Sequence, residues 1–122
     1  MQRLPARQYY GMKRLTTPTH KFVLDIDPRE WDEFRITYSQ IGTIVLEKTE
    51  ADKVSIEVGS STPTRYTMTI RLTQAETALF KPNKKVEMQI RCHYPDGSAF
   101  ASDVMTVNVH DVLNQEMLGD EG

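Results

Sequence analysis

Three histidines and one cysteine are the residues of this 122-residue chain with the greatest capacity for chemistry. His20 opens an apolar alternating run, His93 directly follows Cys92, and His110 closes another such run. Adjacent residues on a strand point to opposite faces of a sheet, so Cys92 and His93 are poorly placed to share one metal ion. The chain contains no Cys-x-x-Cys, His-x-x-x-His or Asp-x-Asp-x-Asp-Gly spacing. The sequence therefore predicts no metal site, and solvated strand ends for His93 and His110.

Catalysis by a nucleophile or by an acid–base pair has no recognisable pattern either. The sequence holds no nucleophile elbow, no phosphate-binding loop and no patterned pair of carboxylates. Cys92 shares the apolar phase of Ile90 and Tyr94, which predicts a small buried core residue rather than a reactive thiol. We therefore expect a protein that is not an enzyme, with no catalytic residue and no cofactor.

Trp31 is the only tryptophan and follows a short polar segment. Its indole ring has two interpretations: a platform for a ligand, or a cap over an open end of the fold. Large aromatic side chains usually serve packing, which favours the cap.

Strands must position these residues, because apolar and polar side chains alternate with a period of two residues after Pro18. The alternating runs cover residues 22–26, 34–38, 43–48, 54–58, 66–72, 86–94 and 101–109. Turn residues at 40–42 and 95–97 predict hairpins. About seven strands with antiparallel connections predict an all-β fold, namely an antiparallel two-sheet β-sandwich of Ig-like or baseplate-like type.

Three short segments break the strand period. Asp27 and Thr73 each have the spacing of a helix N-cap, with a glutamate three residues later, and each predicts a single helical turn. Residues 111–118 precede Gly119, which predicts a short C-terminal helix.

The charge is unevenly distributed along the chain. The net charge of −2 comes from 15 basic and 17 acidic residues, yet the first 24 residues hold five basic and no acidic side chains. The last twelve residues hold four acidic and no basic ones. We expect an extended basic N-terminal arm at residues 1–18, a β-sandwich domain at residues 19–111, and a short helix with an acidic tail at residues 112–122.

The basic arm is the most suggestive feature outside the expected core. Its candidate partner contacts are Arg3, Arg7, Tyr9, Tyr10, Lys13 and Arg14. Five bases beside an acidic remainder are too few for a nucleic-acid interface, so we expect no nucleic-acid partner. Two alternatives stay open: an arm that lies on a neighbouring protein, or a solvated terminus. Deletion of residues 1–15 is then expected to leave a folded monomer.

No apolar run approaches the length of a membrane span, and the N-terminus lacks the apolar stretch of a secretory signal. We expect no membrane partner.

Several stretches resemble small β-sandwich structural or accessory proteins of tailed phages and prophages of Gram-positive bacteria. The similar stretches are residues 16–22, 36–40 with 45–48, 71–80, and 86–91 continuing through 101–104. Together they span about residues 16–113, and the start of these proteins is similar to the segment at Met12, a second plausible start. The similarity lies in strand and turn patterns, so no catalytic residue is carried over.

This resemblance implies a non-enzymatic virion component that decorates the head or forms part of the tail or baseplate. It implies contacts with other virion proteins and with copies of the same chain, localisation in the virion, and synthesis in the bacterial host cytoplasm. The alternative function is a β-sandwich module that binds carbohydrate or a host surface. That alternative predicts an exposed aromatic pair beside a groove, with Trp31 exposed rather than packed.

Overall fold

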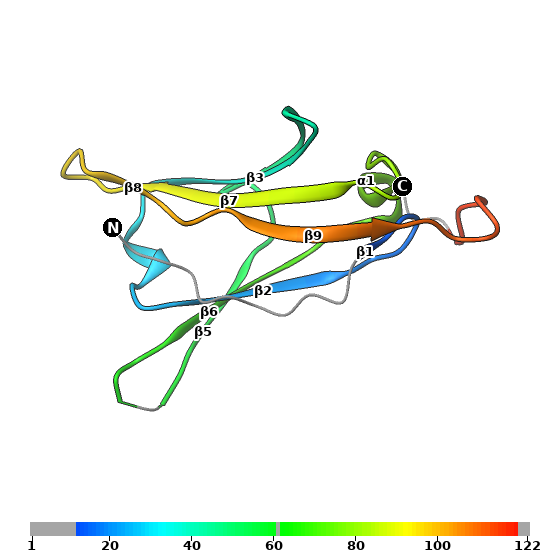
Figure 1. Cartoon of the computed structure of the whole chain (residues 1–122). Coiled ribbons are helices and arrows are strands. Elements are labelled where there is room, and N and C mark those ends of the chain that lie inside the picture. The colour runs from blue at the N-terminus through cyan, green and yellow to red at the C-terminus, as the bar shows by residue number, and fades with distance from the viewer. Residues whose placement is uncertain (1–11, 61, 120–122) are drawn as a thin grey trace.

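The computed structural model describes residues 12–60 and 62–119 of the chain. Its strands form two sheets, which lie as two layers in Figure 1. The six-stranded sheet has the order β1-β9-β7-β3-β4, with β8 also paired to β7; its strands are Met12–Lys13 (β1), Glu33–Gln40 (β3), Thr43–Thr49 (β4), Lys85–His93 (β7), Ala99–Ala101 (β8) and Met105–His110 (β9). The three-stranded sheet has the order β2-β6-β5, with strands Thr19–Leu24 (β2), Ser55–Val58 (β5) and Tyr66–Arg71 (β6). The predicted all-β fold class is confirmed.

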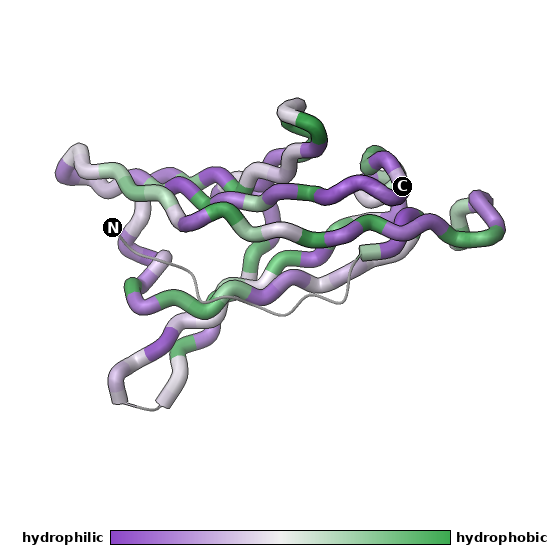
Figure 2. Tube along the Cα trace, in the orientation of Figure 1, coloured by the Kyte–Doolittle hydropathy of each residue, from purple (hydrophilic) through white to green (hydrophobic). Residues whose placement is uncertain are grey.

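Alternating side chains explain how the two sheets share one core. On β7, the buried residues alternate with exposed or half-buried ones, and β9 repeats the pattern. The alternation is visible in Figure 2 as short green and purple stretches along the strands. The buried core consists of Met12, Phe22, Leu24, Ile36, Tyr38, Met68, Ile70, Leu72, Phe80, Val86, Met88, Ile90, Met105, Val107 and Val109.

The predicted helix caps and hairpins, which depend on residues close together in the sequence, are confirmed. A 3₁₀ turn, η1 (Pro28–Glu30), begins at Asp27, whose carboxylate accepts a hydrogen bond from the Arg29 backbone N–H. Helix α1 (Gln74–Ala78) begins with a capping box, in which the side chains of Thr73 and Glu76 each accept a bond from the other's backbone N–H. The two predicted hairpins lie between β3 and β4 and between β7 and β8.

The predicted last strand at residues 101–109 is two strands, because Ser102 replaces part of the ladder. Its hydroxyl oxygen accepts a hydrogen bond from the Ile90 backbone N–H at 3.0 Å, and its own N–H donates to the Ile90 carbonyl at 2.8 Å. The hydroxyl occupies the place of a backbone carbonyl, so regular pairing of β9 with β7 starts only at Met105.

The prediction of a C-terminal helix is wrong, because residues 111–119 contain none. The side chains of Asp111 and Asn114 accept hydrogen bonds from backbone N–H groups one and two residues later, which competes with helix formation. The Gln74 side chain bonds both backbone groups of Leu118, at 2.5 and 2.8 Å, and so holds the segment against α1.

Part of the predicted N-terminal arm belongs to the folded domain. Met12 is buried in the core, and β1 pairs with β9 in parallel register. The Leu72 backbone N–H donates to the Pro18 carbonyl, so the chain also stays close to the domain after β1. Residues 1–11, which hold the rest of the predicted arm, lie outside the described residues, as does the end of the acidic tail. None of the described helices is long and apolar enough to span a membrane.

Candidate functional site

The chemically capable side chains lie apart from one another. Within residues 12–60 and 62–119, no group of three or more His, Cys, Asp or Glu side chains is placed to hold a metal ion. His20 is buried with its Nδ1 2.8 Å from the Tyr38 hydroxyl oxygen, whereas the His93 Nδ1 lies 2.7 Å from a carboxylate oxygen of Asp32. His110 is exposed at the end of β9.

The protonation of these groups suits structural positions. Burial lowers the pKa of His20 to about 4, so the ring is neutral at pH 7. The hydrogen bond to Asp32 raises the pKa of His93. Burial raises the pKa of Cys92, which keeps the thiol protonated and unreactive; its predicted position in the core is confirmed.

Trp31 packs against the core, as expected of a cap. Its ring is half-buried and lies beside Phe34, with ring centroids 6.0 Å apart. It lines a narrow apolar pocket with Ile26 and Phe100, and its buried indole N–H has no hydrogen-bond partner among the described residues. This geometry differs from the exposed tryptophan that a carbohydrate platform requires.

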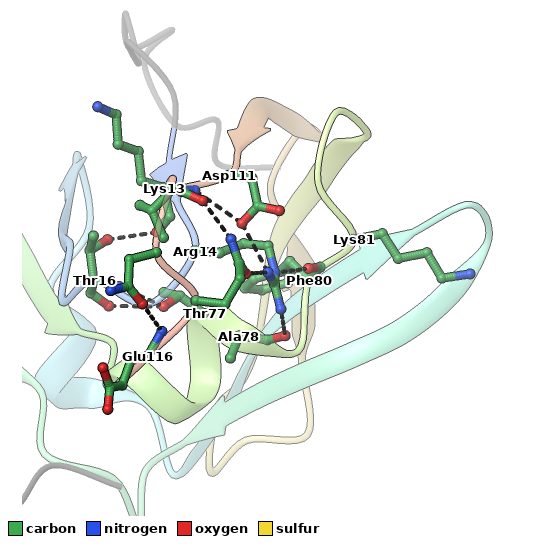
Figure 3. Close-up of polar contacts among 12 residues, drawn as sticks. Lys13, Arg14, Thr16, Thr77, Ala78, Phe80, Lys81, Asp111 and Glu116 are labelled. Atoms are coloured by element: carbon green, nitrogen blue, oxygen red, sulfur yellow. Dashed lines mark hydrogen bonds and ion pairs between the residues drawn. The ribbon is translucent and has the colours of Figure 1, made fainter. Parts of the chain in front are cut away.

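Arg14, one of the predicted partner contacts, is instead bonded within the chain. Figure 3 shows its guanidinium group among groups from α1 and from the segment after β9. Nε donates to the Phe80 carbonyl at 2.8 Å and Nη2 to the Ala78 carbonyl at 2.9 Å. Nη1 donates to Asp111 at 2.9 Å and to Gln115 at 2.6 Å. We call this group, Arg14 with Ala78, Phe80, Asp111 and Gln115, the Arg14 corner.

The Arg14 corner is a structural joint. Arginine suits it because the guanidinium fork satisfies carbonyls left unpaired near the C-terminal end of a helix. The Arg14 backbone N–H also donates to the His110 carbonyl at 2.9 Å. Of the other predicted contacts, Lys13 is exposed on β1, and Arg3, Arg7, Tyr9 and Tyr10 lie outside the described residues.

A surface that the sequence analysis missed lies at the hairpin between β3 and β4. We call residues 41–44 the β3–β4 tip. Ile41 and Ile44 are 66% and 61% exposed. Figure 1 shows the tip projecting from its sheet at the top of the view, and Figure 2 shows a hydrophobic stretch there. Exposed apolar side chains at a projecting position are typical of a contact with another molecule.

The backbone of the tip is strained. Ile41 has φ +51° and Gly42 has φ +73°, the pair of left-handed residues that a tight hairpin turn requires. Glycine adopts this conformation freely, but a β-branched isoleucine does so at a cost of about 1–2 kcal/mol. Asparagine would satisfy the same turn without that cost, so the isoleucine serves neither the turn nor the solubility of the domain.

The base of the tip is held in place by a buried side chain. The Gln40 amide N–H donates to the Lys81 carbonyl at 2.9 Å, and the Gln40 amide oxygen accepts from the Lys81 backbone N–H at 2.7 Å. Gln40 is 4% exposed. The tip therefore starts from a fixed point on the loop after α1.

Strand β4 lies at the edge of its sheet but carries features that discourage strand addition. A bulge shifts the register at Val45, between the Ser39–Ile44 and Tyr38–Leu46 pairs. Lys48 is buried and forms an ion pair with Glu76 of α1. Bulges and inward-pointing charges both oppose edge-to-edge pairing, so β4 is poorly suited to strand addition.

Comparison of the chain with protein-family models, with curated proteins and with solved structures finds no match.

Proposed function

We propose that this chain is a non-enzymatic structural or accessory protein of a tailed-phage virion. It decorates the head or forms part of the tail or baseplate, through contacts with other virion proteins and with copies of itself. The observation that carries the protein–protein role is the β3–β4 tip, where Ile41 and Ile44 are exposed to water and Ile41 lies in a strained backbone conformation. The virion assignment is supported by the resemblance across residues 16–113.

The fold type that we propose is an Ig-like β-sandwich, a finer assignment than the all-β class. It is supported by the strand order. The order β2-β6-β5 corresponds to strands B, E and D of an immunoglobulin-like domain, and β9-β7-β3-β4 to strands G, F, C and C′. Strand β1, parallel to β9, then extends the second sheet at its other edge.

A binding rather than a catalytic role is also favoured by the positions of the reactive side chains. Cys92 is buried with a raised pKa, and His20 is buried with a lowered one. The buried, protonated thiol of Cys92 is a poor nucleophile at pH 7, and the buried ring of His20 is not accessible to a substrate as a general base. The carbohydrate-binding alternative has no observation in its favour, because Trp31 packs against the core.

The assignment is tested by locating the gene and the protein. We expect the gene to lie beside capsid, portal or tape-measure genes, and mass spectrometry of density-purified particles from an induced host to detect the chain at a fixed copy number. Placement in a metabolic operon, together with absence of the chain from purified particles, would contradict the virion role.

The tip is tested in the same particles. A host expressing Ile41→Asn in place of the natural chain should yield particles with reduced copy number. The control Val58→Asn makes the same change at an exposed residue of β5 and should leave the copy number unchanged.

A further inference from the structure

Two surfaces of opposite charge lie on either side of α1 and the loop that follows it. The first is the β3–β4 tip together with nearby exposed residues of the loop, and we call it the basic tip surface. Its members are Ile41, Ile44, Leu79, Lys81, Lys84 and, at the start of β7, Lys85. Glu47 and Glu87 line a groove beside Ile44, so the basic charge lies on the loop side of the tip. Leu79 is 59% exposed, and the three lysines carry the basic charge. The Gln40 amide bonds the backbone of Lys81 and of Lys84 and so joins the tip to this loop.

The second surface is the segment at residues 111–119, which we call the acidic C-terminal segment. It contains Asp111 and Glu116, and its exposed apolar side chains include Leu113, which is fully exposed, and Leu118, which is 74% exposed. The segment is anchored at both ends: Arg14 bonds Asp111, and Gln74 bonds the backbone of Leu118. The leucines are therefore held in water on a fixed backbone.

Figure 1 shows the β3–β4 tip and the C-terminal segment at separate places, although the Arg14 corner joins the loop after α1 to Asp111. Ile41 and Ile44 therefore stay uncovered by the segment of the same chain. Each presents apolar side chains that contribute nothing to the core. One surface is flanked by lysines, and the other carries Glu116, since Asp111 is already paired with Arg14. The apolar groups and the charges of the two surfaces are therefore complementary. Every copy of the chain carries both surfaces.

We propose that the chain self-associates by packing the basic tip surface of one copy against the acidic C-terminal segment of another. In a dimer with two-fold symmetry both contacts form at once. Because Gln40 already holds the base of the tip in place, less conformational entropy is lost on association. This inference rests on the protein–protein component of the proposed function and names the surface that copies use. It does not depend on the virion assignment.

The first experiment measures association of the full chain by sedimentation velocity over a concentration series. The wild-type chain should associate reversibly, with an affinity that falls as salt increases. Ile41→Asn and Leu113→Ser should each weaken association about 10-fold. The control Val58→Asn should have the affinity of the wild type. Thermal melts check folding, and Ile41→Asn should melt above the wild type. A wild-type chain that stays monomeric throughout the series overturns the proposal.

The second experiment tests the pairing of the two surfaces by charge reversal. The double variant Lys81→Glu/Lys84→Glu and the single variant Glu116→Lys each place like charges across both contacts, so each alone should associate about 10-fold more weakly. An equimolar mixture of the two places opposite charges across both contacts and should regain near-wild-type affinity. Association in the mixture no stronger than in the separate variants overturns the tip-to-segment pairing.

These outcomes are separable from the virion assignment. Charge-dependent self-association with no chain in purified particles would remove the virion role and leave this inference standing. A chain that is present in particles but monomeric in solution would overturn this inference and leave the virion role standing.

Discussion

The Arg14 corner and the β3–β4 tip are joined to the same loop of the molecule and are built in opposite ways. At the corner, a half-buried guanidinium group pairs with carbonyl oxygens and a carboxylate, and each partner comes from a distant part of the chain. At the tip, apolar side chains are exposed on a backbone that a β-branched residue disfavours. The corner stabilises the fold, whereas the tip is maintained at a cost to it. That contrast supports the proposal that the tip serves a contact outside the domain.

The largest expected effect is at the corner. Arg14→Ala removes the donors to the Ala78 and Phe80 carbonyls and should lower the free energy of unfolding by about 3 kcal/mol. Urea denaturation measures the change. Arg14→Lys should recover little, because one ammonium group cannot reproduce the guanidinium fork. The control Lys13→Ala removes an exposed charge and should change the free energy by less than about 0.5 kcal/mol. Equal effects of Arg14→Ala and Lys13→Ala would contradict the structural role of the corner.

Deletion of residues 1–15 should lower the free energy of unfolding at least as much as Arg14→Ala does, because Met12 is lost from the core too. This outcome is contrary to the expectation from sequence.

Acidification should lower the free energy of unfolding through His20, on the tip side of the molecule, while the Arg14 corner keeps its ion pair. His20 contacts Tyr38 of β3, the strand that leads to the tip. Its pKa is about 4 when folded, below the ordinary value of 6.5, so the unfolded chain binds a proton first as pH falls. The stability that the neutral ring provides is complete above pH 6.5 and is lost between pH 6.5 and 4, by about 3 kcal/mol in total. The Arg14–Asp111 pair persists in this window, because hydrogen bonds from Gln115 and Arg14 lower the pKa of Asp111.

The measurement is the free energy of unfolding of the wild type and of His20→Gln between pH 7.5 and pH 4. The difference between the two curves isolates the histidine from other titrating groups. A difference that does not change with pH would show that His20 is not the source of the acid sensitivity.

Gln40→Ala should release the base of the tip. It leaves the Lys81 backbone groups without their amide partner and should cost about 2 kcal/mol in stability. It should also weaken self-association, because the tip is no longer held in one position. Val58→Asn is the control, since Val58 is exposed on β5 outside both association surfaces and its change should cost less. Unchanged association in a folded Gln40→Ala variant would show that the tip does not need its anchor.

The smallest expected effect has the opposite sign. Ile41→Asn relieves the strained turn and should stabilise the domain by about 1 kcal/mol, which raises the melting temperature by about 4 °C. Ile41→Val keeps the β-branched strain and should leave stability nearly unchanged. Differential scanning calorimetry measures both. A less stable Ile41→Asn variant would show that the isoleucine serves the fold.

The sequence predicted the features that depend on near neighbours. Alternation located β2 to β7, and the capping pattern located α1, because both depend on local periodicity and spacing. Strand β1 was missed because two residues show no period, and its pairing partner, β9, lies about 97 residues away in the chain. The C-terminal helix was predicted wrongly because the partner that holds Leu118 is Gln74, which no local pattern indicates.

The candidate site was harder to predict than the fold. Lys48 lies two residues after Leu46 and shares its side of β4. The bulge at Val45 turns both residues toward the core and leaves Ile44 outward, and Lys48 there meets Glu76. The sequence analysis placed the partner contacts on basic residues of the N-terminus, and it treated Ile41 only as part of a turn. The one available signal was an isoleucine before glycine at a position where asparagine is typical.

The parallel pairing of β1 with β9 has a mechanical consequence. A pull applied through the chain before β1 and after β9 draws these strands past one another in opposite directions. Force then acts along the strands and across their hydrogen bonds, so the bonds between Met12, Lys13 and their partners on β9 must yield together rather than one by one. The guanidinium of Arg14 stands beside this pair and bonds the segment that follows β9. Resistance to shear at this joint would let the domain transmit tension between its neighbours while its core stays closed.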